Sequence, residues 1–213
     1  MNKKEIKIIN DKFNKLYEQS QATIIGKFIL KFTECETINL IKKLGLKRSS
    51  RTIDVGCGIG RTLRMFRNNQ FFNSIGIDNS KNAIRLCERN GLRRNKDVFL
   101  INAKKTPFSD NEFDLVFEEG LLEHFKNFQP FIDEMCRISK KYVVLIQPNK
   151  FSLAHKLMDR FTNDINIKEI PYEIHDFCEA FRINNFKLKS LKNGFLNIFW
   201  ILVFERLGNK NVV

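Results

Sequence analysis

Short apolar runs recur along this chain from about residue 50 onward, and stretches with a helical pattern separate them. The runs have three to five residues and lie at 52–54, 74–78, 98–101, 113–117 and 142–146. Between them, apolar residues recur every three or four positions, as they do at 61–68, 81–90 and 130–139. Strands that alternate with helices predict βα units and a mostly parallel sheet.

Further elements are predicted toward both ends of the chain. Residues 1–45 have apolar residues at helical spacing, and Gly45 is expected to cap the last of these helices. A helix at 174–185 and a strand at 187–191 precede a final apolar run, 195–204, which predicts a strand buried on both faces. Contact of that run with a membrane is the alternative. No apolar run approaches the length of about 18 residues that a membrane-spanning helix needs, so none is predicted.

The composition indicates one globular domain in a reducing compartment. The chain has 213 residues, 43% of them hydrophobic, and no repeat or linker divides it. Its five cysteines include no C-x-x-C pair, and the first residues have no signal-peptide core. Both features predict a cytoplasmic protein.

The chain is strongly basic, with a formal net charge of +13. A positive field attracts nucleic acid, anionic lipid or an acidic substrate. However, the basic residues do not alternate with aromatic residues as they do on a base-stacking surface. A lysine-rich solvated surface is therefore the favoured interpretation, and nucleic acid is the less favoured partner.

The stretch T-I-D-V-G-C-G-I-G-R-T combines a strand end, a tight turn and a helix start. After Asp54, glycines occupy every second position at Gly56, Gly58 and Gly60. Glycine permits positive φ and lets a ligand touch bare backbone, while the next helix offers unpaired N–H groups. The spacing fails the dinucleotide fingerprint, and no Gly-Lys-Ser/Thr follows to make a phosphate loop. A strand-to-helix corner without a ligand is the alternative.

A second acid, Asp78, ends the next predicted strand. In an open parallel sheet, ligands bind at the carboxyl ends of the strands, and a carboxylate there can accept two hydrogen bonds from a ribose diol. Alternatively, Asp78, Asn79 or Ser80 caps the helix at 81–90. Both roles are compatible if Ser80 is the cap.

Four motifs at the ends of successive strands resemble those of the class I methyltransferases that use S-adenosylmethionine. They are the acid with its glycine turn, then Asp78, then Asn102-Ala103 where the family often has Asp-Ala, and finally T-P-F-S-D-N-E-F-D-L-V-F at 106–117. The resemblance implies an α/β fold, a Rossmann-like, doubly wound sheet of seven strands. The sheet would be mostly parallel, with an antiparallel last strand inserted between strands five and six.

The resemblance is clear over about residues 50–147 and extends over the rest of the chain only in the order of elements. It implies one domain over 1–213. Helices at 1–45 would precede a cofactor-binding half at 50–147, and 148–213 would hold a substrate-facing insertion and the last strands.

The resemblance also implies which residues hold S-adenosylmethionine. The glycine turn would cradle the methionine end, Asp78 would bind the ribose, and Asn102 would contact adenine through its amide. Cys57 is expected to be a small packing residue within the turn. The cofactor-binding residues are expected to be Asp54, Gly56, Cys57, Gly58, Gly60, Asp78, Asn79, Asn102, Ala103 and Glu118.

His124 is the candidate catalytic residue, in the stretch E-E-G-L-L-E-H-F that follows the fourth strand. Histidine titrates near neutral pH, so it can accept a proton from a methyl acceptor. A histidine held by hydrogen bonds at a helix start is the alternative. Some relatives bind a divalent ion through Glu-x-x-Glu-His here, but Gly120 replaces the first Glu, so no metal is expected. His155 and His175 are expected to face solvent or to cap helices.

The resemblance implies an SN2 methyl transfer, with a small molecule as the favoured acceptor, for which the protein places the nucleophile in line and excludes water. Residues 149–172, where the resemblance fades, are a candidate lid, with two short surface helices as the alternative. A nucleic-acid methyltransferase and a cofactor-binding protein without catalysis are the alternatives.

Overall fold

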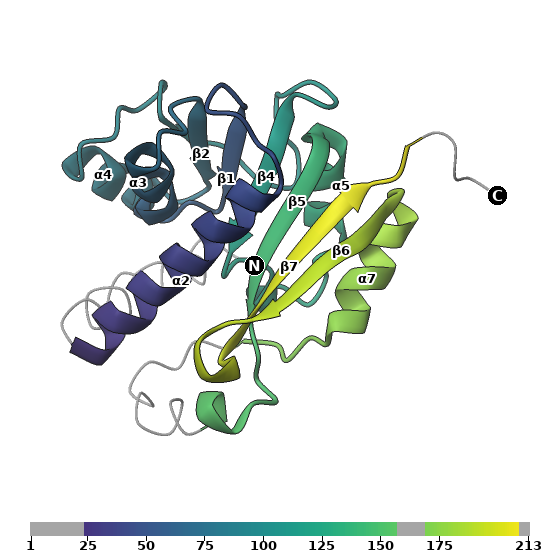
Figure 1. Cartoon of the computed structure of the whole chain (residues 1–213). Coiled ribbons are helices and arrows are strands. Elements are labelled where there is room, and N and C mark those ends of the chain that lie inside the picture. The colour runs from purple at the N-terminus through teal and green to yellow at the C-terminus, as the bar shows by residue number, and fades with distance from the viewer. Residues whose placement is uncertain (1–23, 157–168, 209–213) are drawn as a thin grey trace.

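The described chain forms one sheet of seven strands with helices on both faces (Figure 1). The structure is a computed structural model that describes residues 24–156 and 169–208. In the order β3-β2-β1-β4-β5-β7-β6, neighbouring strands are hydrogen-bonded. The strands are β1 (Thr52–Val55), β2 (Ser74–Asp78), β3 (Val98–Leu100), β4 (Phe113–Glu119), β5 (Ser139–Pro148), β6 (Phe186–Asn193) and β7 (Phe199–Arg206).

Strand direction agrees with the expected topology. Strands β1 to β5 are paired in parallel, whereas β7 is antiparallel to both β5 and β6. The last strand of the chain therefore lies reversed between the fifth and the sixth. This confirms the predicted seven-stranded arrangement.

The helices cover both faces of the sheet, as a doubly wound fold requires. They are α2 (Ile24–Lys43), α3 (Arg61–Asn68), α4 (Lys81–Arg89), α5 (Gln129–Ile138) and α7 (Ile174–Ile183), with 3-10 turns η1 (Leu122–His124) and η2 (Phe195–Asn197). One face packs against α5 and α7, and the other against α2 and α3. Helix α4 contacts β2 and β3. None of the described helices is long and apolar enough to cross a bilayer. The helices predicted within 1–23 lie outside the described residues.

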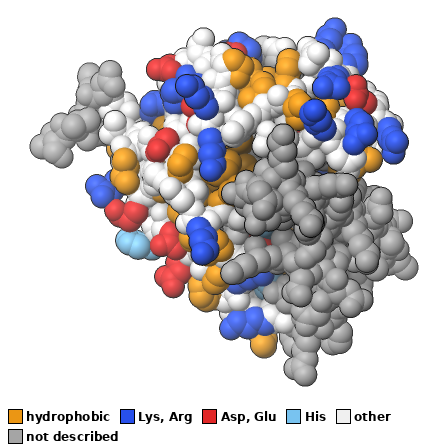
Figure 2. All heavy atoms as spheres, turned by 180° about the vertical axis from the view of Figure 1, so that it is seen from behind, with side chains coloured by type: hydrophobic (Ala, Val, Ile, Leu, Met, Phe, Trp, Pro, Cys, Tyr) orange, Lys and Arg blue, Asp and Glu red, His pale blue; other side chains and the backbone are white. Residues whose placement is uncertain are grey.

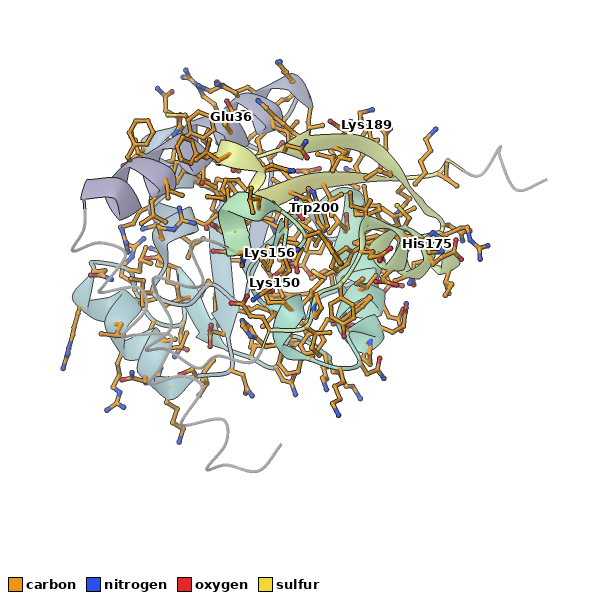
Figure 3. The ribbon with its side chains drawn as sticks, turned by 90° about the horizontal axis from the view of Figure 1, so that it is seen from below. Glu36, Lys150, Lys156, His175, Lys189 and Trp200 are labelled. Carbon is orange, nitrogen blue, oxygen red and sulfur yellow. The ribbon has the colours of Figure 1, made fainter. Side chains whose placement is uncertain are left out.

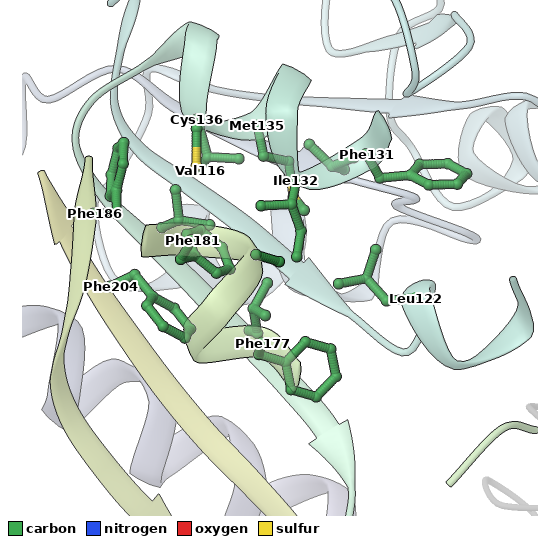
Figure 4. Close-up of a cluster of buried hydrophobic side chains, with 14 of the residues drawn as sticks. Val116, Leu122, Phe131, Ile132, Met135, Cys136, Phe177, Phe181, Phe186 and Phe204 are labelled. Carbon is green, nitrogen blue, oxygen red and sulfur yellow. The ribbon is translucent and has the colours of Figure 1, made fainter. Parts of the chain in front are cut away.

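Alternation along β5 divides its side chains between the two faces. Val143 and Leu145 join the cluster under α5 and α7, while Val144 and Ile146 join the cluster under α2 and α3. Figure 4 shows the first cluster, in which the Phe181 ring of α7 lies against Phe204 of β7. Their ring centroids are 3.8 Å apart with an interplanar angle of 7°. Burying one such ring stabilises the fold by about 1.5–3 kcal/mol.

Several element ends differ from the sequence prediction. Strand β4 continues two residues beyond Phe117, because Glu118 and Glu119 still pair with β5. Strand β7 begins only at Phe199, because residues 195–197 form the turn η2. Apolar periodicity locates the centres of strands well, but backbone pairing decides where they end.

Candidate functional site

The carboxyl ends of the parallel strands meet at one edge of the sheet, called here the carboxyl edge. Parallel pairing places Val55 beside Ile77, and Asp78 beside Leu100. Pro148, at the end of β5, lies beside Phe199 at the start of the reversed strand β7. Figure 3 views the molecule from this side, with Lys150 and Trp200 near its centre. Ligands of open parallel sheets bind at this edge.

The glycine turn after β1 is tight, and it leaves open space beside Gly58. The φ angles of Gly56, Gly58 and Gly60 are 78°, 52° and 76°, all in the left-handed region that favours glycine. A Cβ on Gly60 would lie 2.1 Å from Leu92 Cδ1, so that position admits no side chain. A Cβ on Gly58 would meet no heavy atom within 4 Å. The turn is therefore closed by packing at Gly60 and accessible to a ligand at Gly58.

Cys57 is buried within the turn, where it packs against β2. A Cβ on Gly76 would lie 2.8 Å from Cys57 Cβ, so the glycine of β2 leaves room for the cysteine. The structure thus gives Cys57 the packing environment expected from its small size.

Asp78 joins the glycine turn to the end of β2. Its Oδ2 accepts a hydrogen bond from Gly58 N (3.0 Å), and its Oδ1 accepts one from Ser80 N (2.8 Å). Burial raises the pKa of Asp78 to about 6, although these backbone donors oppose the shift. Each oxygen of a carboxylate has a second lone pair, so both can still accept from a ligand.

The helix after β2 does not need Asp78 as its cap. Ser80 is the N-cap of α4, and its Oγ accepts from Ala83 N (3.2 Å). Asn79 is exposed between the two. Of the three capping candidates, Ser80 holds the helix, which leaves Asp78 directed at the turn.

Asn102 and Ala103 lie just beyond β3 on the same edge. Ile101 N donates to Asp78 O (3.1 Å), which ties the start of this loop to β2. Asn102 is exposed, and its Oδ1 accepts from Lys104 N (3.0 Å). Ala103 is buried. The fold thus brings the expected ribose and adenine residues to neighbouring strand ends.

Asp54 lies beneath the turn rather than on its surface. It is 2% exposed, and burial raises its pKa well above the usual value, with Glu119 adding to the rise. The positive charge of Arg61 opposes this rise in pKa. Arg61 forms ion pairs with Glu119 and with Glu34, and its Nη1 lies 3.4 Å from Glu34 Oε1. The start of α3 therefore carries a cation among several carboxylates.

Glu118 points into the protein instead of toward the carboxyl edge. Its side chain is fully buried; one oxygen accepts from Leu121 N and the other accepts from Gln147 Nε2 (2.6 Å). Burial and the nearby Glu123 raise the pKa of Glu118 well above its usual value. The side chain of Glu118 stabilises the turn between β4 and η1 through these hydrogen bonds. A contact of Glu118 with a ligand would therefore come from its backbone.

Glu123 and His124 lie side by side on η1, and the side chains of both are buried. The exposed fractions of their side chains are 7% and 6%, and Glu123 Oε1 lies 3.6 Å from His124 Nε2. Within the described part of the chain, Glu123 Oε2 has no hydrogen-bond partner. A buried polar atom without a partner is costly, so this oxygen indicates a place for a ligand group.

Charged groups from two other segments surround this pair. Ile170 N donates to Glu123 O (2.8 Å), and the neighbouring Glu169 forms an ion pair with Lys150 (2.6 Å). Burial, together with Glu169 and Glu119, raises the pKa of Glu123 to about 8, and Lys150 opposes the rise. Sequence reasoning considered Glu123 only as part of a metal motif. The apolar neighbours of Glu123 in the sequence, Leu121, Leu122 and Phe125, could have indicated that this residue is buried.

The raised pKa of Glu123 predicts a pH-dependent stability. Between its ordinary pKa of 4.5 and about 8, the folded protein holds a proton that the unfolded chain releases, so stability falls as pH rises. Glu123→Gln should flatten this part of the profile, measured as Tm between about pH 5 and pH 8. Glu88→Gln, at an exposed position of α4, is the matched control. An unchanged slope in Glu123→Gln would contradict the prediction.

The other two histidines differ from each other. His175 is exposed as expected, but His155 is 4% exposed, so the expectation that it faces solvent is wrong. It lies in a helical segment at 153–156, whose Ala154 packs against the cluster that contains Ile198. Among the described residues, no group of three or more His, Cys, Asp or Glu side chains is arranged to hold a metal ion.

Comparisons of this sequence with a family profile and with known proteins agree on one family. The family profile for a methyltransferase domain matches residues 53–146. An uncharacterized protein of Methanocaldococcus jannaschii is 30% identical over 187 residues, covering 87% of this chain and 76% of that protein. A sterol 24-C-methyltransferase of Schizosaccharomyces pombe is 30% identical over 105 residues, covering 47% of this chain and 28% of that enzyme. The match to the sterol enzyme is thus limited to about a quarter of its length.

A solved structure shares the fold over nearly the whole chain. Magnesium protoporphyrin IX methyltransferase of Synechocystis, determined with bound S-adenosylhomocysteine, superposes with a TM-score of 0.71 and 15% identity. The superposition covers 92% of this chain and 94% of the Synechocystis chain. At this identity the comparison concerns the fold, which matches the strand order described above.

Proposed function

Because the chain belongs to the class I S-adenosylmethionine-dependent methyltransferases, we propose that it transfers a methyl group from this cofactor to a small-molecule acceptor. The observation that carries the proposal is the hydrogen bond between Asp78 Oδ2 and Gly58 N. The carboxylate of Asp78 is suited to binding a ribose diol. The bond connects it to Gly58, the position at which the turn has open space. A nucleoside with a ribose diol and a group that lies on the glycine backbone fits both features at one strand edge.

The described residues fit the cofactor as follows. The backbone at Gly56 and Gly58 would hold the methionine end, Asp78 the ribose, and Asn102 with Ala103 the adenine. Gly58 supplies the required space, since its Cβ position is open. The cofactor supplies a methyl group on positively charged sulfur, which needs no activation by the protein. The chain therefore has to orient the acceptor and keep water out.

The acceptor side of the site is proposed to lie at η1. His124 and Glu123 are buried there, next to the end of β4 and the ion pair of Lys150 with Glu169. We propose that His124 takes up the proton that a hydroxyl or amine acceptor loses, with Glu123 as its neighbour. Burial raises the pKa of Glu123 to about 8, so its carboxyl group can hold a proton beside the imidazole.

A nucleic-acid acceptor is less well supported than a small molecule. Exposed basic residues gather on α4 and the following loop, between Lys81 and Lys96, and Figure 2 shows Lys and Arg side chains on that side. Buried and half-buried charges at the carboxyl edge are mostly acidic; they include Asp54, Asp78, Glu119 and Glu123. The cations at this edge, Arg61 and Lys150, already pair with Glu119 and Glu169, so the site offers little attraction to phosphate and a neutral acceptor suits it better. All five cysteines are free thiols, which fits the proposed cytoplasmic location.

Ligand binding tests the proposal directly. A ligand that binds only the folded protein raises the free energy of unfolding by about 2.7 kcal/mol when its concentration is about a hundred times Kd. For a domain of this size, Tm should rise by about 5–10 °C with S-adenosylhomocysteine. Adenosine diphosphate is the control and should have little effect. The absence of a shift with about millimolar S-adenosylhomocysteine would refute the assigned cofactor.

The role of His124 can be separated from cofactor binding. His124→Ala should slow methyl transfer by at least about tenfold, because a proton acceptor in the acceptor site is lost. The affinity for S-adenosylhomocysteine, measured by calorimetry, should stay within about twofold. Transfer of labelled methyl groups into fractionated cell extract provides the activity measurement. His175→Ala, at an exposed position of α7, is the control; full activity in His124→Ala would remove the residue from the mechanism.

A further inference from the structure

The turn between β6 and β7 holds a leucine in an unfavourable conformation. Leu196 has φ 48° and ψ 26°, and the next residue, Asn197, has φ 59°. Asparagine tolerates the left-handed region, but leucine pays a steric penalty there. Burial does not compensate, because Leu196 is 65% exposed. A strained residue that presents an apolar side chain to solvent points to a use for that side chain.

Segments that contact this turn carry other exposed apolar side chains. Phe28 is 57% exposed, Phe151 50% and Leu153 73%. With Leu196 they are called here the apolar rim. Seven large hydrophobic side chains of the described residues are exposed, and four of them belong to the rim. This concentration at one place is unusual for a solvated surface.

Contacts join the members of the rim to one part of the fold. The ring of Phe195, next to Leu196, lies edge-on to the ring of Phe28, with centroids 5.5 Å apart. Phe151 stacks on Trp200 at 6.3 Å. Asn149 N donates to Ile198 O (2.8 Å), which ties the turn after β5 to the end of η2. Figure 1 shows these two turns beside each other at the lower end of the sheet.

The rim borders the acceptor side of the site. Phe151 follows Lys150, which forms an ion pair with Glu169. Ile170, the residue after Glu169, donates a backbone hydrogen bond to the carbonyl oxygen of Glu123. A surface that covers the rim would therefore face the entrance for the acceptor.

Lysines accompany the apolar side chains. The Lys31 side chain is 76% exposed, although it pairs with Glu34 at 4.0 Å. Lys156 is exposed three residues after Leu153. Lys192 is 45% exposed, although it pairs with Glu36. Apolar side chains that protrude among lysines are typical of proteins that bind the interface of an anionic membrane.

We propose that the apolar rim docks on the surface of an anionic lipid bilayer. Leu153 and Leu196 would enter the headgroup region, while Lys31 and Lys156 approach the lipid phosphates. The net charge of +13 supports attraction to such a surface. With the function proposed above, docking would open the carboxyl edge toward an apolar acceptor dissolved in the bilayer. The docking itself needs neither cofactor nor acceptor.

Flotation of the full chain with vesicles tests the proposal. Vesicles of phosphatidylglycerol and phosphatidylcholine in equal parts should carry the protein, and pure phosphatidylcholine vesicles should carry much less. The double variant Leu153→Ser/Leu196→Asn should lower the fraction bound by at least about tenfold. Asn is chosen because it tolerates the left-handed conformation, so Leu196→Asn alone should leave Tm unchanged or raise it by about 1–3 °C. Loss of binding without loss of stability distinguishes docking from a structural role.

Phe72→Ser is the matched control, because Phe72 is 68% exposed but lies before β2, at the opposite edge of the sheet. It should bind vesicles as the wild type does. Equal loss in Phe72→Ser, or unchanged binding in the double variant, would overturn the proposal. So would self-association that the double variant abolishes, without vesicle binding, since the rim would then join two copies. Binding of S-adenosylhomocysteine tests the proposed function separately and should be unaffected in the double variant.

Discussion

Replacing Asp78 with alanine should weaken the binding of S-adenosylmethionine by at least about tenfold, a loss of about 1.4 kcal/mol or more. Two effects combine in this substitution. The carboxylate that would accept the two ribose hydroxyls is removed, and hydrogen bonds to charged groups contribute about 1.5–3 kcal/mol each. The bond from Gly58 N is lost as well, so the turn that holds the other end of the cofactor is less well ordered. Isothermal titration calorimetry measures the affinity.

Ser80→Ala is the matched control for Asp78→Ala. It removes the N-cap of α4 from the same loop but leaves the carboxylate in place. We expect it to lower Tm, through the loss of about 1 kcal/mol of stability, with little change in affinity. If both variants bind the cofactor as the wild type does, the sugar contact lies elsewhere.

Gly58→Ala should also reduce cofactor affinity by at least about tenfold, for a steric reason. Its φ of 52° disfavours any side chain, and a Cβ there points into the open space proposed for the cofactor. The added methyl group would therefore collide with a ligand that touches the backbone. Calorimetry gives the affinity and thermal unfolding gives the stability.

Gly45→Ala separates backbone strain from ligand exclusion. Gly45 has φ 71° and, like Gly58, meets no atom within 4 Å of its Cβ position. It follows α2 and lies before the first strand, away from the carboxyl edge. Both variants should lose about 1 kcal/mol of stability, but only Gly58→Ala should lose affinity. Equal affinity in the two variants would contradict the placement of the cofactor at Gly58.

Much of the fold could be predicted from the sequence, because strands, helices and turns are specified by residues that are close together in the chain. Apolar runs and glycines marked the strands and the turns, and β2 and α3 have the expected limits, Ser74–Asp78 and Arg61–Asn68. The position of β7 between β5 and β6 came from the family resemblance, since no local pattern specifies which strands become neighbours. The shift of the start of β7 to Phe199 depends on the backbone of η2, where Leu196 adopts a conformation that its residue type does not suggest.

The site was predictable only in part, for a related reason. The sequence places Asp78 and the glycines at strand ends, and their relative positions follow from the parallel sheet. The direction of a side chain is not encoded in this way. Glu118 turns inward because Gln147 of β5 and the backbone N–H of Leu121 donate hydrogen bonds to its two oxygens. Glu123 is buried because residues 169–170, remote in sequence, lie against η1.

The insertion of β7 has a consequence for synthesis of this protein on the ribosome. The first five strands can pair in parallel as they emerge, but β6 has no partner until β7 follows it, since β7 alone joins it to the sheet. Until residue 206 has left the exit tunnel, the nascent chain therefore presents β5 as an open edge of consecutive aliphatic residues. A pause in translation before that point would prolong a state prone to pair with other chains, and chaperones would have their greatest effect there.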